Sequence, residues 1–167
     1  MTTGITPVVR LSELPLEDNE RNAAFGSKDA PRIGTKAGLK SIGFTYTVVQ
    51  PGRSGAPFHN HHVEDEMFVV MEGEGTYRFG SERYPFKAGD VLVAPAGGQE
   101  TAHQIINTGT VPLKLVAISN QSDTEVCEYP DSGKFLVSSK PADGAKLRHI
   151  GRHPEQNLDY WDGEPGA

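Results

Sequence analysis

The chain has 167 residues, a length that fits one domain whose core buries roughly 68–70% of the surface exposed by the unfolded chain. A formal net charge of −6 argues against nucleic acid as a partner, and no apolar run approaches the length of a membrane span. The lone cysteine, Cys127, excludes an internal disulfide, and the first residues carry no signal-peptide pattern, so we expect a reduced, cytoplasmic protein.

Composition changes divide the chain into three segments. Residues 1–40 are predicted to form an N-terminal arm of irregular structure, with an edge strand near Val8–Leu11. Residues 41–120 carry the pattern of a β-barrel. Residues 121–167 are polar and rich in turns, with a possible further strand at KFLVSS. We expect this C-terminal extension to pack on the barrel or on a partner subunit, with Tyr160 and Trp161 at the contact.

Residues 41–120 predict about eight strands at the spacing expected of an all-β sandwich or barrel, and no amphipathic helix. The 19 glycines and 12 prolines of the chain supply frequent turns. The strand-like segments are SIGFTYTVV, FHNHH, EMFVVMEG, TYRF, ERYPF, VLVAPAG, HQIIN and PLKLVAIS. The run Met67–Met71 is apolar on both faces, so we expect it to be buried between layers.

The stretch HNHHVEDEM, residues 59–67, holds three of the chain's six histidines. His59 and His61 lie two residues apart on a strand, so their side chains share a face. Glu66 opens the next strand, and His103 begins a later strand that can return to the same place. Two or three histidines with a carboxylate suit one divalent transition metal, namely iron, manganese, nickel, copper or zinc.

The same spacing also fits a loop of solvated side chains that cap turns. We favour this interpretation for Glu64 and Asp65. His62 is a candidate substitute ligand, or an outer residue that hydrogen-bonds a ligand. The two interpretations differ in pH dependence, because a metal needs neutral imidazoles and loses affinity below the ordinary histidine pKa of about 6.5.

Two motifs in this region resemble those of the cupin superfamily. The first is a glycine, His-x-His, four residues, a glutamate, six residues and a glycine, here Gly52, His59, His61, Glu66 and Gly73. Its first loop is one residue longer than usual. The second is a glycine, Pro-x-Gly, a histidine and an asparagine, here Gly89, Pro95, Gly97, His103 and Asn107. Five residues separate Gly97 from His103, where two are common.

The resemblance covers residues 52–107 and implies an all-β double-stranded β-helix, the cupin or jelly-roll barrel. It implies one divalent transition metal inside the barrel, held by His59, His61, Glu66 and His103. The segments EYPDSGKF and LDYWDGE are similar to those of an uncharacterised branch of small single-domain microbial cupins. Such proteins are commonly homodimers, and we expect that assembly here.

Three functions fit these features. The leading one is a metal-dependent enzyme of the oxygenase type acting on a small organic substrate. The second is an isomerase or lyase that uses the ion as a Lewis acid and needs a separate acid or base, for which Glu100, His62 and Tyr77 are candidates. The third is a non-catalytic module that binds a small molecule or acts in regulation.

Other side chains are weaker candidates for substrate contacts. Arg78 and Arg83 can meet a substrate carboxylate, although water-facing strand positions explain them equally well. An apolar pocket wall can be formed by Tyr46, Phe68, Phe79 and Ile105, although packing in the core is the more frequent role of such residues.

Overall fold

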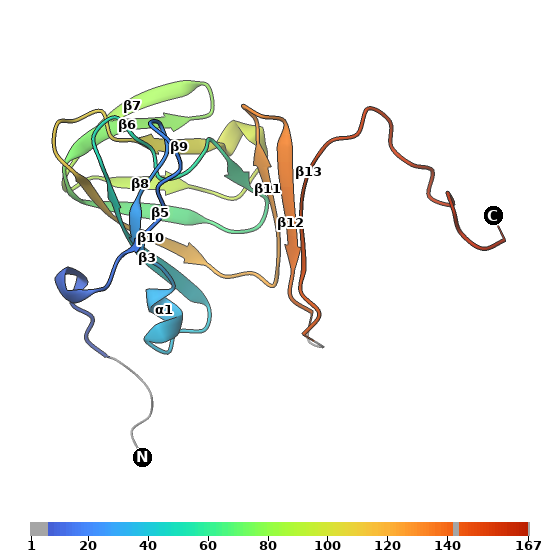
Figure 1. The fold of residues 1–167 in the computed structure, drawn as a ribbon, viewed down its shortest axis with the longest axis horizontal. Helices are drawn as coiled ribbons and strands as arrows, with labels where there is room; N and C mark the ends of the chain where they lie inside the picture. Colours follow the sequence, from blue (N-terminus) through green and yellow to red (C-terminus); the bar gives the residue numbers. More distant parts are fainter. Residues whose placement is uncertain (1–6, 142–143, 167) are drawn as a thin grey trace, which may run out of the picture.

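Antiparallel strands account for nearly all the regular secondary structure of the described residues (Figure 1). The computed structural model describes residues 7–141 and 144–166; residues 1–6 of the predicted arm, and residues 142–143 and 167 of the predicted extension, lie outside this description. In the described ranges the strands are β1 Glu17–Asp18, β2 Lys28–Ala30, β3 Ile42–Val49, β4 Asn60–His61, β5 Glu66–Glu72, β6 Glu74–Phe79, β7 Glu82–Lys87, β8 Val91–Ala94, β9 His103–Ile106, β10 Leu113–Asn120, β11 Thr124–Tyr129, β12 Lys134–Ser139 and β13 Leu147–Arg152. The helical turns are η1 Leu11–Glu13, α1 Ile33–Lys36 and η2 Gln99–Thr101.

The strands form three sheets with the orders β1-β2-β3-β10-β5-β8, β13-β12-β11-β4 and β7-β6-β9. Two backbone hydrogen bonds join the smaller sheets: the His59 amide donates to the His103 carbonyl at 3.1 Å, and the His103 amide donates to the His59 carbonyl at 2.7 Å. The predicted all-β double-stranded β-helix is confirmed, and the eight strands expected in residues 41–120 are β3 to β10.

The core lies between the six-stranded sheet and the β7-β6-β9 sheet. Alternate residues of each strand point inward, as the pleat requires. Phe68, Phe79 and Ile105 pack against the buried members, which are Val49, Val70, Tyr77, Phe86, Leu92, Leu113 and Leu115. The barrel interior is therefore apolar apart from the polar cluster described below.

The expectation that Met67–Met71 is buried on both faces is wrong for the single chain. Val70 is 1% exposed, whereas Met67 and Met71 are 37% and 53% exposed. Alternation of the pleat turns Phe68 and Val70 to the core and the two methionines to the outer face of the sheet. A run of apolar residues does not reveal whether anything covers the second face.

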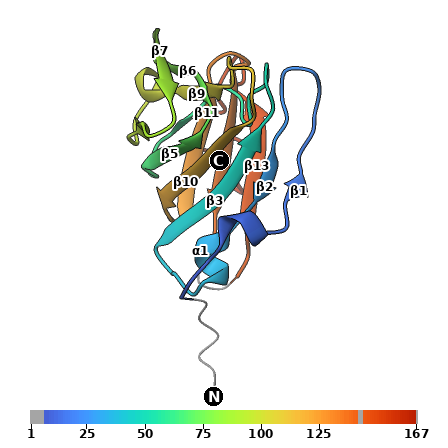
Figure 2. The same cartoon turned by 90° about the vertical axis from the view of Figure 1, so that its left-hand side faces the viewer.

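The predicted edge strand at Val8–Leu11 is also wrong. Residues 8–10 are irregular, and Leu11 begins the short turn η1. The arm instead adds two strands to the six-stranded sheet, β1 and β2, and β2 pairs with β3 through Asp29 and Thr47 among others. Figure 2 shows β1 and β2 beside β3. The N-terminal arm thus supplies part of a barrel wall.

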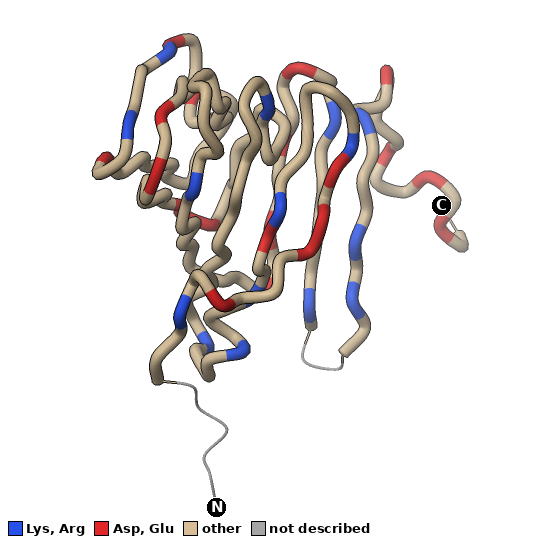
Figure 3. Tube along the Cα trace, turned by 60° about the vertical axis from the view of Figure 1, so that its left-hand side comes forward, with Lys and Arg blue, Asp and Glu red and all other residues tan. Residues whose placement is uncertain are grey.

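The C-terminal segment supplies three strands of the four-stranded sheet, β11, β12 and β13. Its strand β11 pairs with β4, and the predicted strand KFLVSS is confirmed as β12. Basic residues lie at the start of β12 (Lys134) and along β13 (Arg148 and Arg152), and Lys and Arg are blue in Figure 3. Beyond β13 the chain runs away from the barrel (Figure 1), and Tyr160 and Trp161 are exposed and contact each other. Packing of this tail on a partner subunit stays a prediction.

No helix in the described part of the chain is long and apolar enough to cross a membrane.

Candidate metal centre

Strand geometry brings His59 and His61 to one side of their strand. They flank Asn60, whose side chain is fully buried and donates from Nδ2 to the Gly97 carbonyl at 3.0 Å. Since side chains alternate along a strand, both imidazoles point away from Asn60. The backbone bridge between His59 and His103 brings the third imidazole to the same place.

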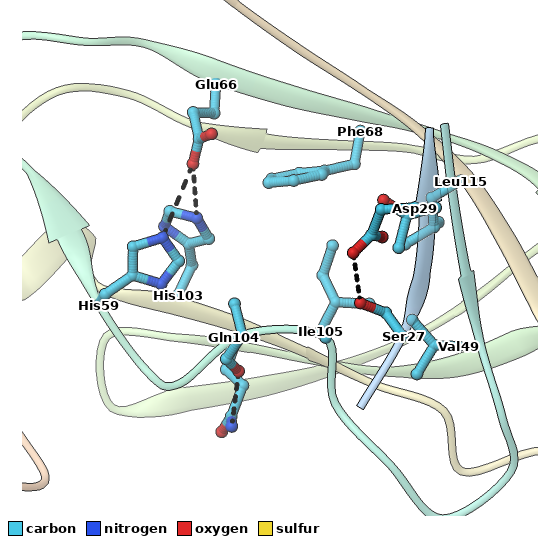
Figure 4. A pocket seen from close by; sticks show the side chains of 13 residues that line it. Ser27, Asp29, Val49, His59, Glu66, Phe68, His103, Gln104, Ile105 and Leu115 are labelled. Carbon is cyan, nitrogen blue, oxygen red and sulfur yellow. Dashed lines mark hydrogen bonds and ion pairs between the residues drawn. The ribbon is translucent and has the colours of Figure 1, made fainter. Parts of the chain in front are cut away.

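Ligand atoms of His59, His61 and Glu66 all lie within 4.8 Å of one another, and His103 joins this group through its contact with Glu66. The Glu66 Oε2 atom lies 3.3 Å from His61 Nε2, 3.2 Å from His103 Nε2 and 3.9 Å from His59 Nε2. Figure 4 shows Glu66 facing His59 and His103. Ligand atoms bound at about 2.0–2.2 Å to one ion stand roughly 3 Å apart or slightly more, so the separations fit a shared transition metal.

The outer nitrogens of the three rings are held by neighbours. His59 Nδ1 lies 2.8 Å from the Pro57 carbonyl oxygen, and His103 Nδ1 lies 3.4 Å from that of Thr101. A carbonyl only accepts, so these Nδ1 atoms donate and leave the Nε2 lone pairs for the centre. Outer hydrogen bonds of this kind orient metal-binding histidines. The donor set and its orientation therefore suit a divalent transition metal.

Burial and mutual contacts set the protonation of these groups. Burial lowers the pKa of His59 to about 4, so its ring is neutral near pH 7 as metal binding requires. Burial also acts to lower the pKa of His61, but hydrogen bonds with Cys127 and Glu66 outweigh it and raise that pKa to about 11, so this ring must release a proton when a metal binds. Burial acts to raise the pKa of Glu66, but hydrogen bonds with His103 and His61 outweigh it and hold that pKa far below its usual value. Glu66 is consequently a carboxylate with its charge directed at the imidazoles.

A second set of residues, which the sequence analysis missed, supports His61 from outside. Its Nδ1 atom lies 3.3 Å from Cys127 Sγ and 3.7 Å from Glu125 Oε2. The buried Glu125 carboxylate also accepts the backbone amides of His62, Val63 and Glu64 at 3.0, 3.2 and 2.7 Å. It therefore fixes the turn that separates His61 from Glu66. The local signal was the i, i+2 spacing of Glu125 and Cys127, but only the pairing of β11 with β4 gives it meaning.

A cavity of about 170 Å³ opens beside His59, Glu66 and His103. Figure 4 shows those three side chains at one side, Asp29 with Ser27 at the other, and Phe68 and Ile105 between them. The remaining lining includes Val49, Leu115 and Gln104. A partly apolar cavity that ends on convergent polar groups is the usual form of a small-molecule site.

Two of the four predicted wall residues line this cavity, Phe68 and Ile105. Phe79 packs in the core instead. Arg78 pairs with Asp131 through two hydrogen bonds of 2.6 and 2.8 Å, so its guanidinium is already engaged. Neither it nor Arg83 is among the residues described as lining the cavity.

The predicted acid and base candidates also lie outside the cavity lining. His62 is exposed and its Nε2 lies 3.1 Å from Glu128 Oε2. Glu100 is exposed on η2, where its carboxylate accepts the Gly98 amide at 3.0 Å. Tyr77 is buried, and its hydroxyl donates to the Val93 carbonyl at 2.8 Å.

Two other motif residues build the frame of the site. Asn107 is fully buried, donates to the carbonyls of Val49 and Val111 at 2.8 and 2.9 Å, and thereby fastens the loop before β10. Gly73 has a φ of +88°, and a Cβ there would lie 3.0 Å from the Leu113 Cα. Glycine therefore allows the β5–β6 turn to approach β10.

Comparison with known proteins agrees with this barrel and site. The model of the cupin domain matches residues 45–119. The oxalate-binding protein of Thermotoga maritima is 30% identical over 121 residues, which are 71% of this chain and 97% of that protein. An uncharacterised protein of Methanocaldococcus jannaschii is 32% identical over 84 residues, which are 48% of this chain and 65% of that protein, just under two thirds of its length. The chain belongs to the cupin superfamily, whose members commonly bind a metal.

Solved structures extend the likeness beyond the barrel. A proposed sugar phosphate isomerase from Acidithiobacillus ferrooxidans has a TM-score of 0.70 and 26% identity, covering 83% of this chain and 86% of that one. A sugar phosphate isomerase from Silicibacter pomeroyi has a TM-score of 0.75 and 22% identity, covering 92% and 98%. The second likeness concerns the fold alone.

Proposed function

We propose that this protein is a metal-dependent enzyme that acts on a small organic substrate, with oxygenase chemistry as the leading type. One divalent transition metal (iron, manganese, nickel, copper or zinc) is held by His59, His61, Glu66 and His103. The observation that carries this proposal is the convergence of three Nε2 atoms on the Glu66 carboxylate, at 3.2 to 3.9 Å, beside a cavity.

The residues of the site would have distinct roles in this reaction. The three histidines and Glu66 hold the ion, which supplies Lewis acidity and, for a redox-active metal, electron transfer at its open positions. Phe68 and Ile105 present apolar surface to the substrate and limit the water beside it. Outer hydrogen bonds keep the rings oriented through each cycle.

An isomerase or lyase is the second candidate function. Its support is the likeness to the proposed sugar phosphate isomerase, together with the Asp29 carboxylate in the cavity wall, which such chemistry can use as a base. The likeness to an oxalate-binding protein supports the third candidate, a non-catalytic binding module. Since Glu100, His62 and Tyr77 are not among the residues described as lining the cavity, the isomerase candidate depends on Asp29 as its acid or base.

Metal analysis and a paired substrate screen test the proposal. Untagged protein purified without chelators is expected to carry near-stoichiometric metal by elemental mass spectrometry. Turnover of a small-molecule panel should stop on chelation and return with one preferred metal. Dependence of that turnover on dioxygen selects the oxygenase, and oxygen-independent turnover selects the isomerase or lyase. Protein that binds no metal even after reloading contradicts the proposal.

A homodimer is part of the same proposal and is supported by the outer face of the six-stranded sheet. This outer apolar face consists of Ile42, Met67, Val91 and Val93, which are 49%, 37%, 51% and 60% exposed. They lie on β3, β5 and β8, and Ile118 of β10, the strand between β3 and β5, lines a surface groove with Ile42, Met67 and Val93. Exposed apolar patches of this kind mark protein contacts more often than free surface.

Val93→Glu is therefore expected to shift the protein from dimer to monomer. A buried carboxylate at the centre of the contact should weaken the dimer at least about 100-fold, because an unpaired charge is costly to desolvate. Light scattering coupled to size exclusion measures the change. Val111→Glu, at a loop position that is also exposed (48%) but is not part of this face, should leave the dimer intact. A monomeric wild-type protein refutes the dimer.

A further inference from the structure

The cavity has a second polar end, opposite the metal centre. Asp29 and Ser27 of the N-terminal arm line it, and Figure 4 shows them across Phe68 and Ile105 from His59 and Glu66. Ser27 Oγ donates to Asp29 Oδ2 at 2.7 Å, so the hydroxyl is directed by the carboxylate. This end of the cavity therefore presents negative charge.

The Asp29 carboxylate accepts a second hydrogen bond at the same oxygen, Oδ2. Asn19 Nδ2 donates to Asp29 Oδ2 at 2.7 Å, while Oδ1 accepts no hydrogen bond from the described residues. One carboxylate oxygen thus has lone pairs available at the cavity wall. Its natural partner is a hydrogen-bond donor such as a hydroxyl or an ammonium group.

The described lining of the cavity offers no positive side chain that could bind an anionic group of a substrate. Among the described residues that line the cavity, none is a lysine or an arginine. The basic residues Lys140, Lys146 and Arg148 line a different groove, which reaches His61 but includes neither Asp29 nor Ser27. A phosphate or a second carboxylate placed beside Asp29 would face like charge in a partly buried site, where screening by water is weak.

From these observations we infer that the enzyme's substrate is a small molecule with a metal-binding oxygen at one end, an apolar middle and an uncharged hydroxyl or a cationic amine at the other. Asp29 is the residue that selects for this far group. The volume of about 170 Å³ suits such a molecule, since a cavity of about 150 Å³ holds benzene. Dicarboxylates and phosphate esters are disfavoured. This inference rests on the proposed function, because the near end is the metal centre.

Four acids of equal chain length test the far-end preference: butanoate, 4-hydroxybutanoate, 4-aminobutanoate and succinate. Each offers one carboxylate to the metal and differs in the group that meets Asp29. Titration calorimetry on metal-loaded wild-type protein should find the hydroxy and amino acids binding at least tenfold tighter than succinate. In Asp29→Asn, an isosteric change, that ratio should fall below about threefold, chiefly because succinate binds better.

The matched control is Asp123→Asn, which makes the same change at an exposed residue outside the cavity and should keep the wild-type ratio. Wild-type protein that binds succinate as tightly as 4-hydroxybutanoate overturns the inference, and this arm needs no variant to fold. An unchanged ratio in Asp29→Asn, or no binding of any of the four acids, also overturns it. Failure of the proposed function is separately visible, as a lack of metal and as binding that chelation leaves unchanged.

Discussion

Replacing His59 by alanine is expected to lower the metal content of the purified protein from near-stoichiometric to near zero while the barrel stays folded. The variant removes one of three nitrogens directed at Glu66 Oε2. Loss of a residue that merely orients a ligand costs about 10–100-fold in metal affinity, so loss of a ligand should cost more than about 100-fold. Elemental analysis of both proteins, with circular dichroism to follow the fold, measures this.

His62→Ala is the matched control for that experiment. His62 is the neighbour of His61, but it is exposed and hydrogen-bonds to Glu128, away from the centre. Its removal should leave metal content within error of the wild type. Full metal occupancy in His59→Ala would exclude His59 as a ligand. Equal losses of metal in both variants would mean that the histidines of this stretch affect metal content only through their general charge.

Glu125→Ala is expected to damage both stability and metal binding, although Glu125 is not a proposed ligand. Its carboxylate is 5% exposed and accepts the amides of His62, Val63 and Glu64. Hydrogen bonds to a charged acceptor contribute about 1.5–3 kcal/mol each, and water can replace part of this at the exposed turn. We therefore expect the free energy of unfolding to fall by about 3 kcal/mol, measured by urea titration of the metal-free protein.

Metal affinity separates a positioning role from a purely structural one. Because Glu125 fixes the turn between His61 and Glu66, the folded Glu125→Ala protein should bind metal about 10–100-fold more weakly. Glu125→Gln keeps the acceptor at Oε1 but presents an amide group to the Glu64 N–H. It should therefore lose less stability and less metal affinity than Glu125→Ala does. Glu82→Ala, at an exposed strand end, should change neither quantity. Wild-type affinity in folded Glu125→Ala would show that the turn needs no such support.

The local sequence pattern was sufficient to predict the barrel strands, because each strand has its own alternation and its own turn residues. Alternation and turn residues placed β3 to β10, and the i, i+2 spacing of His59 and His61 put both on one face. The structure brings these two together with Glu66 and His103 as expected; that they bind metal stays a prediction. Their proximity could be predicted because one short loop carries His59, His61 and Glu66, and one later strand returns His103 to the same place.

The missing parts depend on pairings between distant segments. Asp29 reaches the cavity only because β2 pairs with β3, and Glu125 reaches His61 only because β11 pairs with β4. Neither pairing has a signature in the residues themselves. The prediction of an edge strand at Val8–Leu11 was wrong for a related reason. The apolar pattern of that segment suits a strand, but the segment has no neighbouring strand to pair with. Sheet edges are thus where sequence patterns carry least information.

The candidate metal centre would also act on the folding of the chain. It joins segments far apart in sequence: His103 and Glu66 are 37 residues apart, and Cys127 and His61 are 66 apart. Bringing such segments together costs chain entropy, and contacts of this range slow folding. An ion that needs all four side chains binds the closed barrel and not the open chain. On the proposed function, each tenfold excess of free ion over its Kd then adds about 1.4 kcal/mol to the stability of the fold. The supply of free metal would thus govern the stability of the barrel as well as its chemistry.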